Sequence, residues 1–417
     1  MKVLATPLLG EEPWLATQPV GEESYEAALS HASATARSFL SRWRKERTKL
    51  ERALSLLDRF PAGLEDESFP ARQAQALHGW PLCEALLRKS YEARFTDPKR
   101  MLVLAESAAG VAKHIRVERY PWPGFLADIR ARAFADLGNA YRINDRLSEA
   151  DTAFERARDY LEDGTGDPFL HAHVLDLEAS LRRAQRRLED DIALLDQVSS
   201  LYREAGDLHL AGRALISKGL NMHLRGYPRE TVRLCEEGLR LLEPERDLQL
   251  VKVSQQVLLH ARIDCGEYRQ ASQLLLQSGL REAFAAEPLN LVKLQWMEGK
   301  IHAGLGRPSR AERAFSEARR ELIKRGQVYD AAMVSLELAA LWLRQSRASE
   351  VQDLAEEIYA TFEDLGIQTE AARALQFIHE ACRMQAVTVS MIERVRTFLE
   401  RLPWHPGLRF EPALFVP

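Results

Sequence analysis

The sequence predicts an all-α fold, a right-handed α-solenoid of about eight stacked helix pairs. The first observation is a period of about 40 residues inside apolar segments of helical periodicity, marked by Gly138, Ala179, Gly219, Leu259, Gly299 and Ala339. The second is a pair of further glycine series in the same register. The third is the lack of any alternating run of β-branched residues that would predict a strand. Each period is therefore expected to hold two helices.

The two further glycine series mark the predicted turns. The series at the end of a repeat comprises Gly166, Gly206, Gly326 and Gly366, and the series between the two helices of a repeat comprises Gly226, Gly266 and Gly306. Glycine suits the end of a helix because it adopts a left-handed backbone without a steric cost from Cβ. Inside a repeat, the small residue of the first helix lets a large side chain of the second helix approach closely.

The period divides the chain into segments in a simple order. These are an irregular stretch over 1–23, a helical region with a basic helix over 24–80, a first helix pair and connector over 81–126, six 40-residue repeats over 127–366, a terminal helix pair over 367–402, and a Pro-rich apolar tail over 403–417. Stacked repeats bury a continuous core, so the whole chain can form one elongated domain. We expect Trp404, Phe410 and Phe415 of the tail to cap the last pair.

Two repeats carry a known signature. Leu137-Gly138-x2-Tyr141, followed by Ala150 and Phe154, resembles the L-G-x2-Y…A-x3-F pattern of tetratricopeptide repeats. The period of 40 rather than 34 and the missing first-helix tryptophan depart from that family. Forty-residue units of this kind also resemble the sensor solenoids of bacterial regulatory proteins, including those attached to signal-transducing ATPases. The chain itself has no G-x4-G-K-[ST] phosphate-binding loop.

The resemblance implies a binding groove lined by the first helices. Positions three before, one after and four after the small residue share one side of a helix, which places a candidate concave face. The candidate partner-binding residues on this face are Asn139, Arg142, Asp176, Arg183, His223, Gln256, His260, Trp296, Lys300 and Arg344. The face runs from charged to apolar, so we expect an extended or helical peptide with an apolar anchor at Trp296. Alternatively, Leu336 and Leu343 simply pack beneath a neighbouring helix.

A basic helix near the N-terminus is the strongest local charge bias. Its cations surround Trp43 and comprise Arg42, Arg44, Lys45, Arg47 and Lys49. An acidic protein surface or a nucleic-acid backbone could dock on them, with nucleic acid the lesser alternative because aromatic side chains are few. The simpler interpretation is a solvated helix stabilised by pairs of Arg42 with Glu46 and Arg47 with Glu51.

Composition narrows the remaining classes. The chain has 417 residues, 46% of them hydrophobic, and a net charge of 57 − 61 = −4, which does not predict general binding to nucleic acid or to membranes. Its four cysteines lack C-x-x-C spacing, and neither a signal peptide nor an uninterrupted apolar span of membrane length is evident, so we expect a cytoplasmic protein.

No motif for catalysis, a metal or a cofactor is recognisable. His379-Glu380 is followed by Arg383 where a zinc-binding motif would have its second histidine. The sequence therefore predicts a non-catalytic adaptor or regulatory protein that binds a protein or peptide. The alternative is a ligand- or peptide-responsive sensor or regulatory subunit of a larger bacterial complex that docks through its ends.

Overall fold

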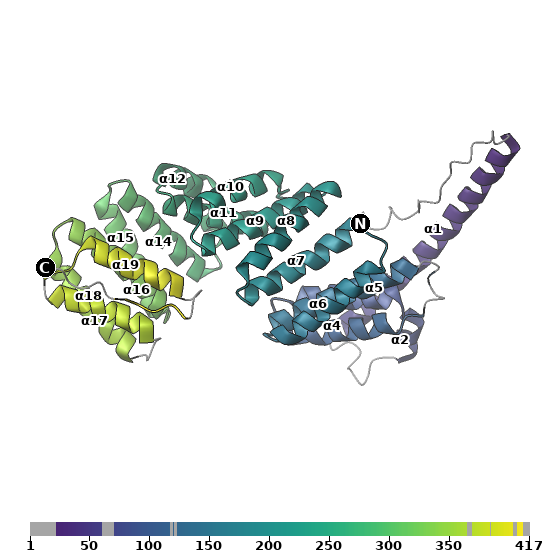
Figure 1. Ribbon diagram of the computed structural model, residues 1–417, viewed down its shortest axis with the longest axis horizontal. Coiled ribbons are helices and arrows are strands. Elements are labelled where there is room, and N and C mark those ends of the chain that lie inside the picture. Colours follow the sequence, from purple (N-terminus) through teal and green to yellow (C-terminus); the bar gives the residue numbers. More distant parts are fainter. Residues whose placement is uncertain are drawn as a thin grey trace. The chain divides into compact units, whose positions relative to one another are not determined.

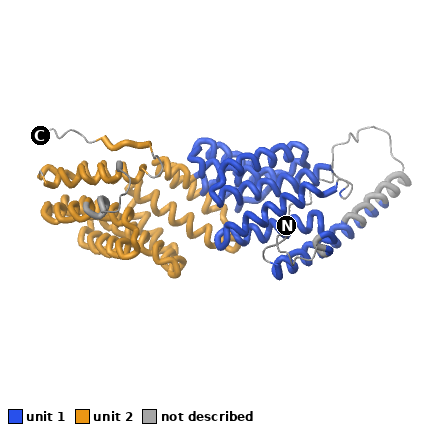
Figure 2. The backbone as a smooth tube through the Cα atoms, turned by 90° about the horizontal axis from the view of Figure 1, so that it is seen from below, with its two compact units in different colours: residues 1–218 blue, residues 219–417 orange. Residues whose placement is uncertain are grey.

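The protein is represented by a computed structural model that describes residues 22–60, 71–116, 120, 123–364, 369–383, 385–402 and 407–411. It separates into two compact units, unit 1 over residues 1–218 and unit 2 over residues 219–417 (Figure 2). Each unit is a stack of antiparallel helix pairs, as Figure 1 shows. No strand occurs in the described ranges, so the predicted all-α, TPR-like solenoid fold is confirmed.

Unit 1 begins with a long helix and a short one, followed by three helix pairs. Its helices are α1 (Glu22–Arg59), α2 (Ala71–Leu77), α3 (Trp80–Ala93), α4 (Pro98–Lys113), α5 (Pro123–Ile143), α6 (Leu147–Glu162), α7 (Pro168–Ala184) and α8 (Leu188–Glu204). The pairs are α3 with α4, α5 with α6 and α7 with α8. Helix α9 (Leu208–Leu224) crosses the boundary between the units.

Unit 2 continues the alternation of first and second helices. Its helices are α10 (Pro228–Leu241), α11 (Leu248–Asp264), α12 (Tyr268–Gln277), α13 (Leu280–Ala283), α14 (Pro288–Gly304), α15 (Pro308–Lys324), α16 (Val328–Arg344), α17 (Ala348–Asp364), α18 (Thr369–Arg383) and α19 (Val389–Arg401). The short α12 ends before Gly279, whose φ of 60° breaks the helix and lets α13 start in a new direction. With α9 counted, eight pairs lie in the described ranges, as predicted.

The predicted crossing points are real close contacts. A Cβ added to Gly138 would lie 2.8 Å from the Phe154 ring, and one added to Gly299 would lie 2.5 Å from the Phe315 ring. Both phenylalanines are buried, at 0% and 1% exposure. Glycine is therefore required at these two crossings, because any Cβ would overlap the ring of the second helix.

The predicted turns within the repeats are also confirmed. Gly226, Gly266 and Gly306 have φ of 80°, 74° and 68°. In the other repeats the same left-handed position is held by Asp145, Arg186 and Ser346, with φ of 59°, 63° and 60°. The turn geometry is thus preserved where the sequence shows no glycine. Of the glycines predicted at repeat ends, Gly366 lies outside the described residues.

The C-terminal end of unit 2 departs from regular stacking. Helix α19 packs against α16, two helices before its own partner α18, as well as against α18 (Figure 1). The Phe410 ring is buried and lies 5.6 Å from the Phe377 ring and 5.0 Å from the Phe398 ring, measured between centroids. This contact agrees with the expected cap, whereas Trp404 and Phe415 lie outside the described residues.

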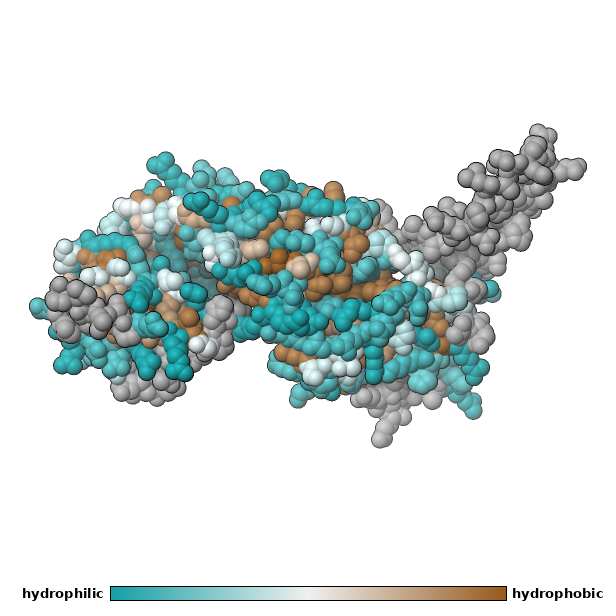
Figure 3. Space-filling model, viewed as in Figure 1, coloured by the Kyte–Doolittle hydropathy of each residue, from teal (hydrophilic) through white to brown (hydrophobic). Residues whose placement is uncertain are grey.

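The surface is mixed rather than uniformly apolar. In Figure 3 the hydrophobic side chains of the described part gather in patches between bands of hydrophilic ones. Among the described helices, none combines the length and the apolar character needed to cross a membrane.

Candidate functional site

Polar contacts between one first helix and the next, or the turn that leads into the next, follow one spacing. Side chains 37 residues apart meet in both units, in the pairs of Asp128 with Thr165, Asp136 with His173, Asp176 with Arg213, His223 with His260, Lys293 with Asp330, and Lys300 with Glu337. This spacing is one 40-residue period less three residues, so each first helix is shifted by nearly one turn relative to the one before. We call the side of the helices that carries these pairs the first-helix face.

In unit 1 this face is a row of ion pairs. Arg132 bridges Glu84 at 2.8 Å and Asp136 at 3.7 Å, and Asp136 also lies 3.1 Å from the His173 ring nitrogen. Burial alone would raise the pKa of Asp136, but the neighbouring His173 and Arg132 outweigh it and hold that pKa below its usual value. The carboxylate is thus charged and structurally satisfied.

Arg142 interrupts the row. Its Nε and Nη2 both donate to Asn139 Oδ1, at 3.1 and 2.7 Å, and no carboxylate of the described residues pairs with it. The residue 37 positions further on is Ala179, which offers no charge. Burial and the positive charge of Arg183 lower the pKa of Arg142, whereas Arg183 itself is bound to the buried Asp191 at 2.7 Å. Arg142 is therefore a half-buried cation that the chain leaves without a counter-charge.

In unit 2 the predicted Lys300 lies inside a charge cluster. Its Nζ is 3.2 Å from Glu337 and 3.9 Å from Glu400, and Arg396 of α19 donates to Glu337 at 2.6 Å. Burial opposes ionisation of both partners, but their mutual attraction raises the pKa of Lys300 and lowers that of Glu337. Lys300 serves to hold α14, α16 and α19 together, which explains its charge without a ligand.

Trp296 is packed rather than open. Its ring lies against the hydrophobic core of unit 2, and Lys300 Nζ is 5.2 Å from the ring centroid. The indole nitrogen is buried without a hydrogen-bond partner among the described residues. Leu336 is only 1% exposed and belongs to the same core, which agrees with the alternative that it packs beneath a neighbouring helix.

Two histidines come together in unit 2. The rings of His223 and His260 lie edge to face with centroids 5.8 Å apart, and His223 Nδ1 is 3.8 Å from Asp264. Burial, His223 and nearby lysines lower the pKa of His260 to about 3, and burial likewise lowers the pKa of His223. Both rings are therefore neutral near pH 7, and these half-buried side chains contact each other edge to face.

The remaining predicted residues are more accessible. Gln256 is half-buried, while Arg344 is exposed and donates to Glu393 of α19 at 2.6 Å. On the basic helix, Arg42, Arg44 and Lys45 are exposed. The expected pair of Arg47 with Glu51 forms at 3.7 Å, but Glu46 binds Lys49 at 2.7 Å instead of Arg42.

No three histidine, cysteine or acidic side chains cluster to hold a metal in the part of the chain that was searched. Burial raises the pKa of Cys83 and of Cys235 to about 12, which disfavours the nucleophilic thiolate. The sequence missed Glu337, Arg396 and Asp136, although the 37-residue spacing would have identified two of them as partners of Lys300 and His173.

Comparison with known proteins identifies the fold. No protein-family model and no curated protein matches the chain. Among solved structures, the apo form of the quorum sensor NprR from B. thuringiensis superposes with a TM-score of 0.55 at 17% identity, over 78% of this chain and 87% of that chain. A Rap protein complexed with Competence and Sporulation Factor gives 0.52 at 9% identity, over 78% and 88%.

A third similar structure is a signal-transduction ATPase with numerous domains. This protein from Pyrococcus horikoshii, which has a tetratricopeptide repeat sensor, gives a TM-score of 0.51 at 14% identity. The match covers 72% of this chain but only 45% of that one. Together these likenesses show that the chain has a TPR-like helical-solenoid fold.

Proposed function

We propose that this chain is a non-catalytic adaptor or regulatory protein that binds a protein or peptide on its first-helix face. The observation that carries the proposal is Arg142, a half-buried guanidinium whose one acceptor among the described residues is the amide oxygen of Asn139. Leaving a cation partly desolvated and unpaired costs stability, whereas the neighbouring charges are satisfied. A bound partner would supply the missing polar contacts.

The similar structures support a regulatory role of this kind. One is a quorum sensor, one is a Rap protein in complex with a factor, and one is an ATPase with a tetratricopeptide repeat sensor. The raised pKa values of the buried thiols Cys83 and Cys235 disfavour nucleophilic chemistry at these two cysteines.

The proposal is tested with a pool of random heptapeptides, acetylated and amidated, incubated with the full chain. Peptides retained through gel filtration are identified by mass spectrometry, and the best is labelled for anisotropy titration. We expect the double variant Asn139→Ala, Arg142→Met to bind that peptide at least about tenfold more weakly, because the two changes remove adjoining polar groups from the first-helix face of unit 1.

Trp296 and Lys300 are poor choices for this test. Trp296 packs against the hydrophobic core of unit 2, and Lys300 forms an ion pair with Glu337. The matched control is Arg42→Gln with Arg44→Gln, which removes exposed cations from α1 and should leave the affinity unchanged. Equal affinity of the wild type and the first-helix double variant, with helicity intact, would exclude this face as the binding site.

The alternative function, a sensor or regulatory subunit that docks through its ends, is favoured by one observation. Arg42, Arg44 and Lys45 of α1 are exposed and have no acidic partner among the described residues. If the α1 control variant loses binding to an acidic protein or to single-stranded DNA while the first-helix variant does not, docking through the N-terminal helix is the better account.

A further inference from the structure

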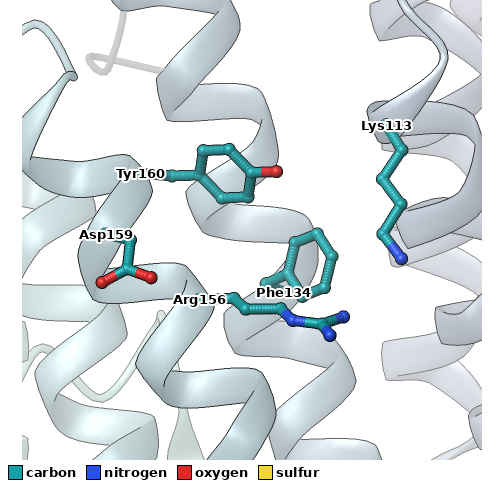
Figure 4. Close-up of a pocket in the computed structure, with 5 residues that line it drawn as sticks. All are labelled: Lys113, Phe134, Arg156, Asp159 and Tyr160. Atoms are coloured by element: carbon teal, nitrogen blue, oxygen red, sulfur yellow. The ribbon is translucent and has the colours of Figure 1, made fainter.

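A second groove lies in unit 1, between the second helices α4 and α6. Two adjoining cavities of about 380 and 410 Å³ share Lys113, Phe134 and Arg156 as lining residues (Figure 4). Nothing in the proposed peptide site involves these residues. The groove is therefore a separate feature that the proposed function leaves unexplained.

The walls follow helical periodicity. Helix α4 contributes Glu106, Ala109, Gly110 and Lys113, helix α6 contributes Glu149, Thr152, Ala153 and Arg156, and α5 forms the floor with Phe134, Leu137 and Tyr141. Such positions, separated by three and four residues, share one side of a helix. Seven residues of α4 span about 10 Å, so the groove is long enough for several residues of an extended chain.

Gly110 is the unusual member of the wall. It lies inside α4, yet a Cβ added to it would meet nothing within 4 Å. Gly138 differs, because its missing Cβ makes room for Phe154 of the same unit. Glycine lowers the stability of a helix interior relative to alanine. No contact with the described residues requires a glycine at position 110. The missing side chain instead leaves space in the groove.

One end of the groove is strongly cationic. Lys113 Nζ lies 5.2 Å and Arg156 Cζ lies 5.7 Å from the centroid of the Phe134 ring. Arg130 Cζ lies 5.7 Å from the Tyr160 centroid, and its N–H groups donate to carbonyls at the end of α4. None of these three cations has a carboxylate partner among the described residues.

The acidic side chains nearby do not neutralise this end. The Asp159 carboxylate points away from Lys113 and Arg156 in Figure 4. At the opposite end, Glu106 accepts from Tyr141 at 3.0 Å, and Glu149 binds Arg146 at 2.9 Å. The groove therefore has one satisfied acidic end, an uncharged middle of small residues, and one cationic end without a counter-charge.

We propose that this groove binds an acidic segment of a partner protein. A carboxylate of the segment lies between Lys113 and Arg156, where the Phe134 ring holds both cations from below. A neighbouring apolar side chain fills the space at Gly110, beside Ala109 and Ala153. A free phosphate would use the cationic end alone, whereas a peptide segment also accounts for the open, uncharged middle.

The test uses two pools of acetylated, amidated heptapeptides that differ only in a fixed central Leu-Glu or Leu-Gln. Each pool is incubated with the full chain, and retention through gel filtration is quantified by mass spectrometry. We expect the Glu pool to be retained about tenfold more than the Gln pool, and Lys113→Gln with Arg156→Gln to abolish this preference.

Gly110→Leu provides an independent test because it fills the groove without changing charge. It should reduce retention of the Glu pool about tenfold while the melting temperature stays the same or rises, since the new side chain enters open space. The matched control Arg313→Gln with Arg320→Gln removes the same charge from exposed positions of α15 and should keep the preference.

Several results would overturn the proposal. These are equal retention of the two pools, retention of neither, full binding by the Gly110→Leu variant, or an equal loss in the α15 control. Complete displacement of the Glu pool by millimolar inorganic phosphate would also overturn it, because the site would then select a small oxyanion and not a protein segment.

Discussion

The first-helix faces of the two units share a register but differ in what completes them. In unit 1, Arg142 has no acid opposite it and remains half-buried without a counter-charge among the described residues. In unit 2, Lys300 meets Glu337 at the common 37-residue spacing, and α19 adds Arg396 and Glu400 to the same cluster. The cation of unit 1 thus lacks an acidic partner among the described residues, whereas the cation of unit 2 is neutralised by the chain itself.

The difference teaches that position on the repeat does not decide function. Arg142 and Lys300 both lie on first helices near the small residue of their repeats, and the sequence suggests the same role for both. Their surroundings separate them, because a charge satisfied by buried acids has little left to offer a ligand, whereas an unsatisfied one does. Four predictions would break or sharpen this contrast.

Glu337→Gln should have the largest effect. It leaves Lys300 and Arg396 buried beside each other without their shared carboxylate, which should cost about 3 kcal/mol of the free energy of unfolding. Asp176→Asn in unit 1 should cost only about 1 kcal/mol, because its partner Arg213 is 34% exposed. Urea denaturation measures both, and hydrogen exchange of α16 and α19 should rise only in the first variant. Similar losses in the two variants would contradict the contrast.

Gly299→Ala and Gly138→Ala test what the two units share. Each added methyl would lie within 3 Å of a buried phenylalanine ring, at 2.5 and 2.8 Å, so each should cost about 2 kcal/mol through overpacking. The variants Gly299→Ala with Phe315→Leu and Gly138→Ala with Phe154→Leu should recover part of the loss. If the single variants are as stable as the wild type in urea, close crossing at these glycines is not what holds the pairs together.

His260→Gln should change how stability depends on pH. The folded pKa is lowered to about 3 from an ordinary value near 6.5, so between these values the unfolded chain binds a proton that the folded chain does not. Stability is therefore lost as pH falls below about 6.5, and removing the imidazole should recover about 2 kcal/mol near pH 4.5.

The pH effect is measured by urea denaturation at several pH values, with His171→Gln as the control because His171 is exposed on unit 1. A difference between wild type and His260→Gln that stays constant from neutral pH to pH 4.5 would show that the His260 ring is not buried as described.

Arg142→Met should have the smallest effect and the opposite sign. The lowered pKa means that the folded protein disfavours the charge, so a neutral side chain of similar length should stabilise it by about 0.5 kcal/mol. Arg183→Met is the matched control and should destabilise the protein, because it removes the ion pair between Arg183 and the buried Asp191. A clear loss of stability in Arg142→Met would mean that the Arg142 guanidinium stabilises the fold.

The first-helix face and the groove at Gly110 differ in how well the sequence predicts them. The first-helix face was predicted from the repeat, and Arg142 and Gln256 are half-buried there, whereas Asn139 is buried, Trp296 packs against the core and Lys300 is held by Glu337. The groove at Gly110 gave no sequence signal, since a glycine inside a helix has the same appearance whether it faces a ring or an open space. Gly138 falls in the 40-residue series and Gly110 does not, but only the tertiary structure shows that Gly110 faces open space.

The sequence by itself determined the all-α repeat, the close crossing at Gly138 and Gly299, and the positions of the turns, because periodic burial and left-handed backbone are local requirements written at fixed intervals. The tertiary structure alone decided which charges meet. Neighbouring first helices are shifted by nearly one turn, and α19 packs against α16, so Glu337 and Arg396 reach Lys300 while Arg142 is left without an acid. These pairings depend on the relative placement of helices far apart in the chain, and Coulomb energy becomes decisive only where packing removes water.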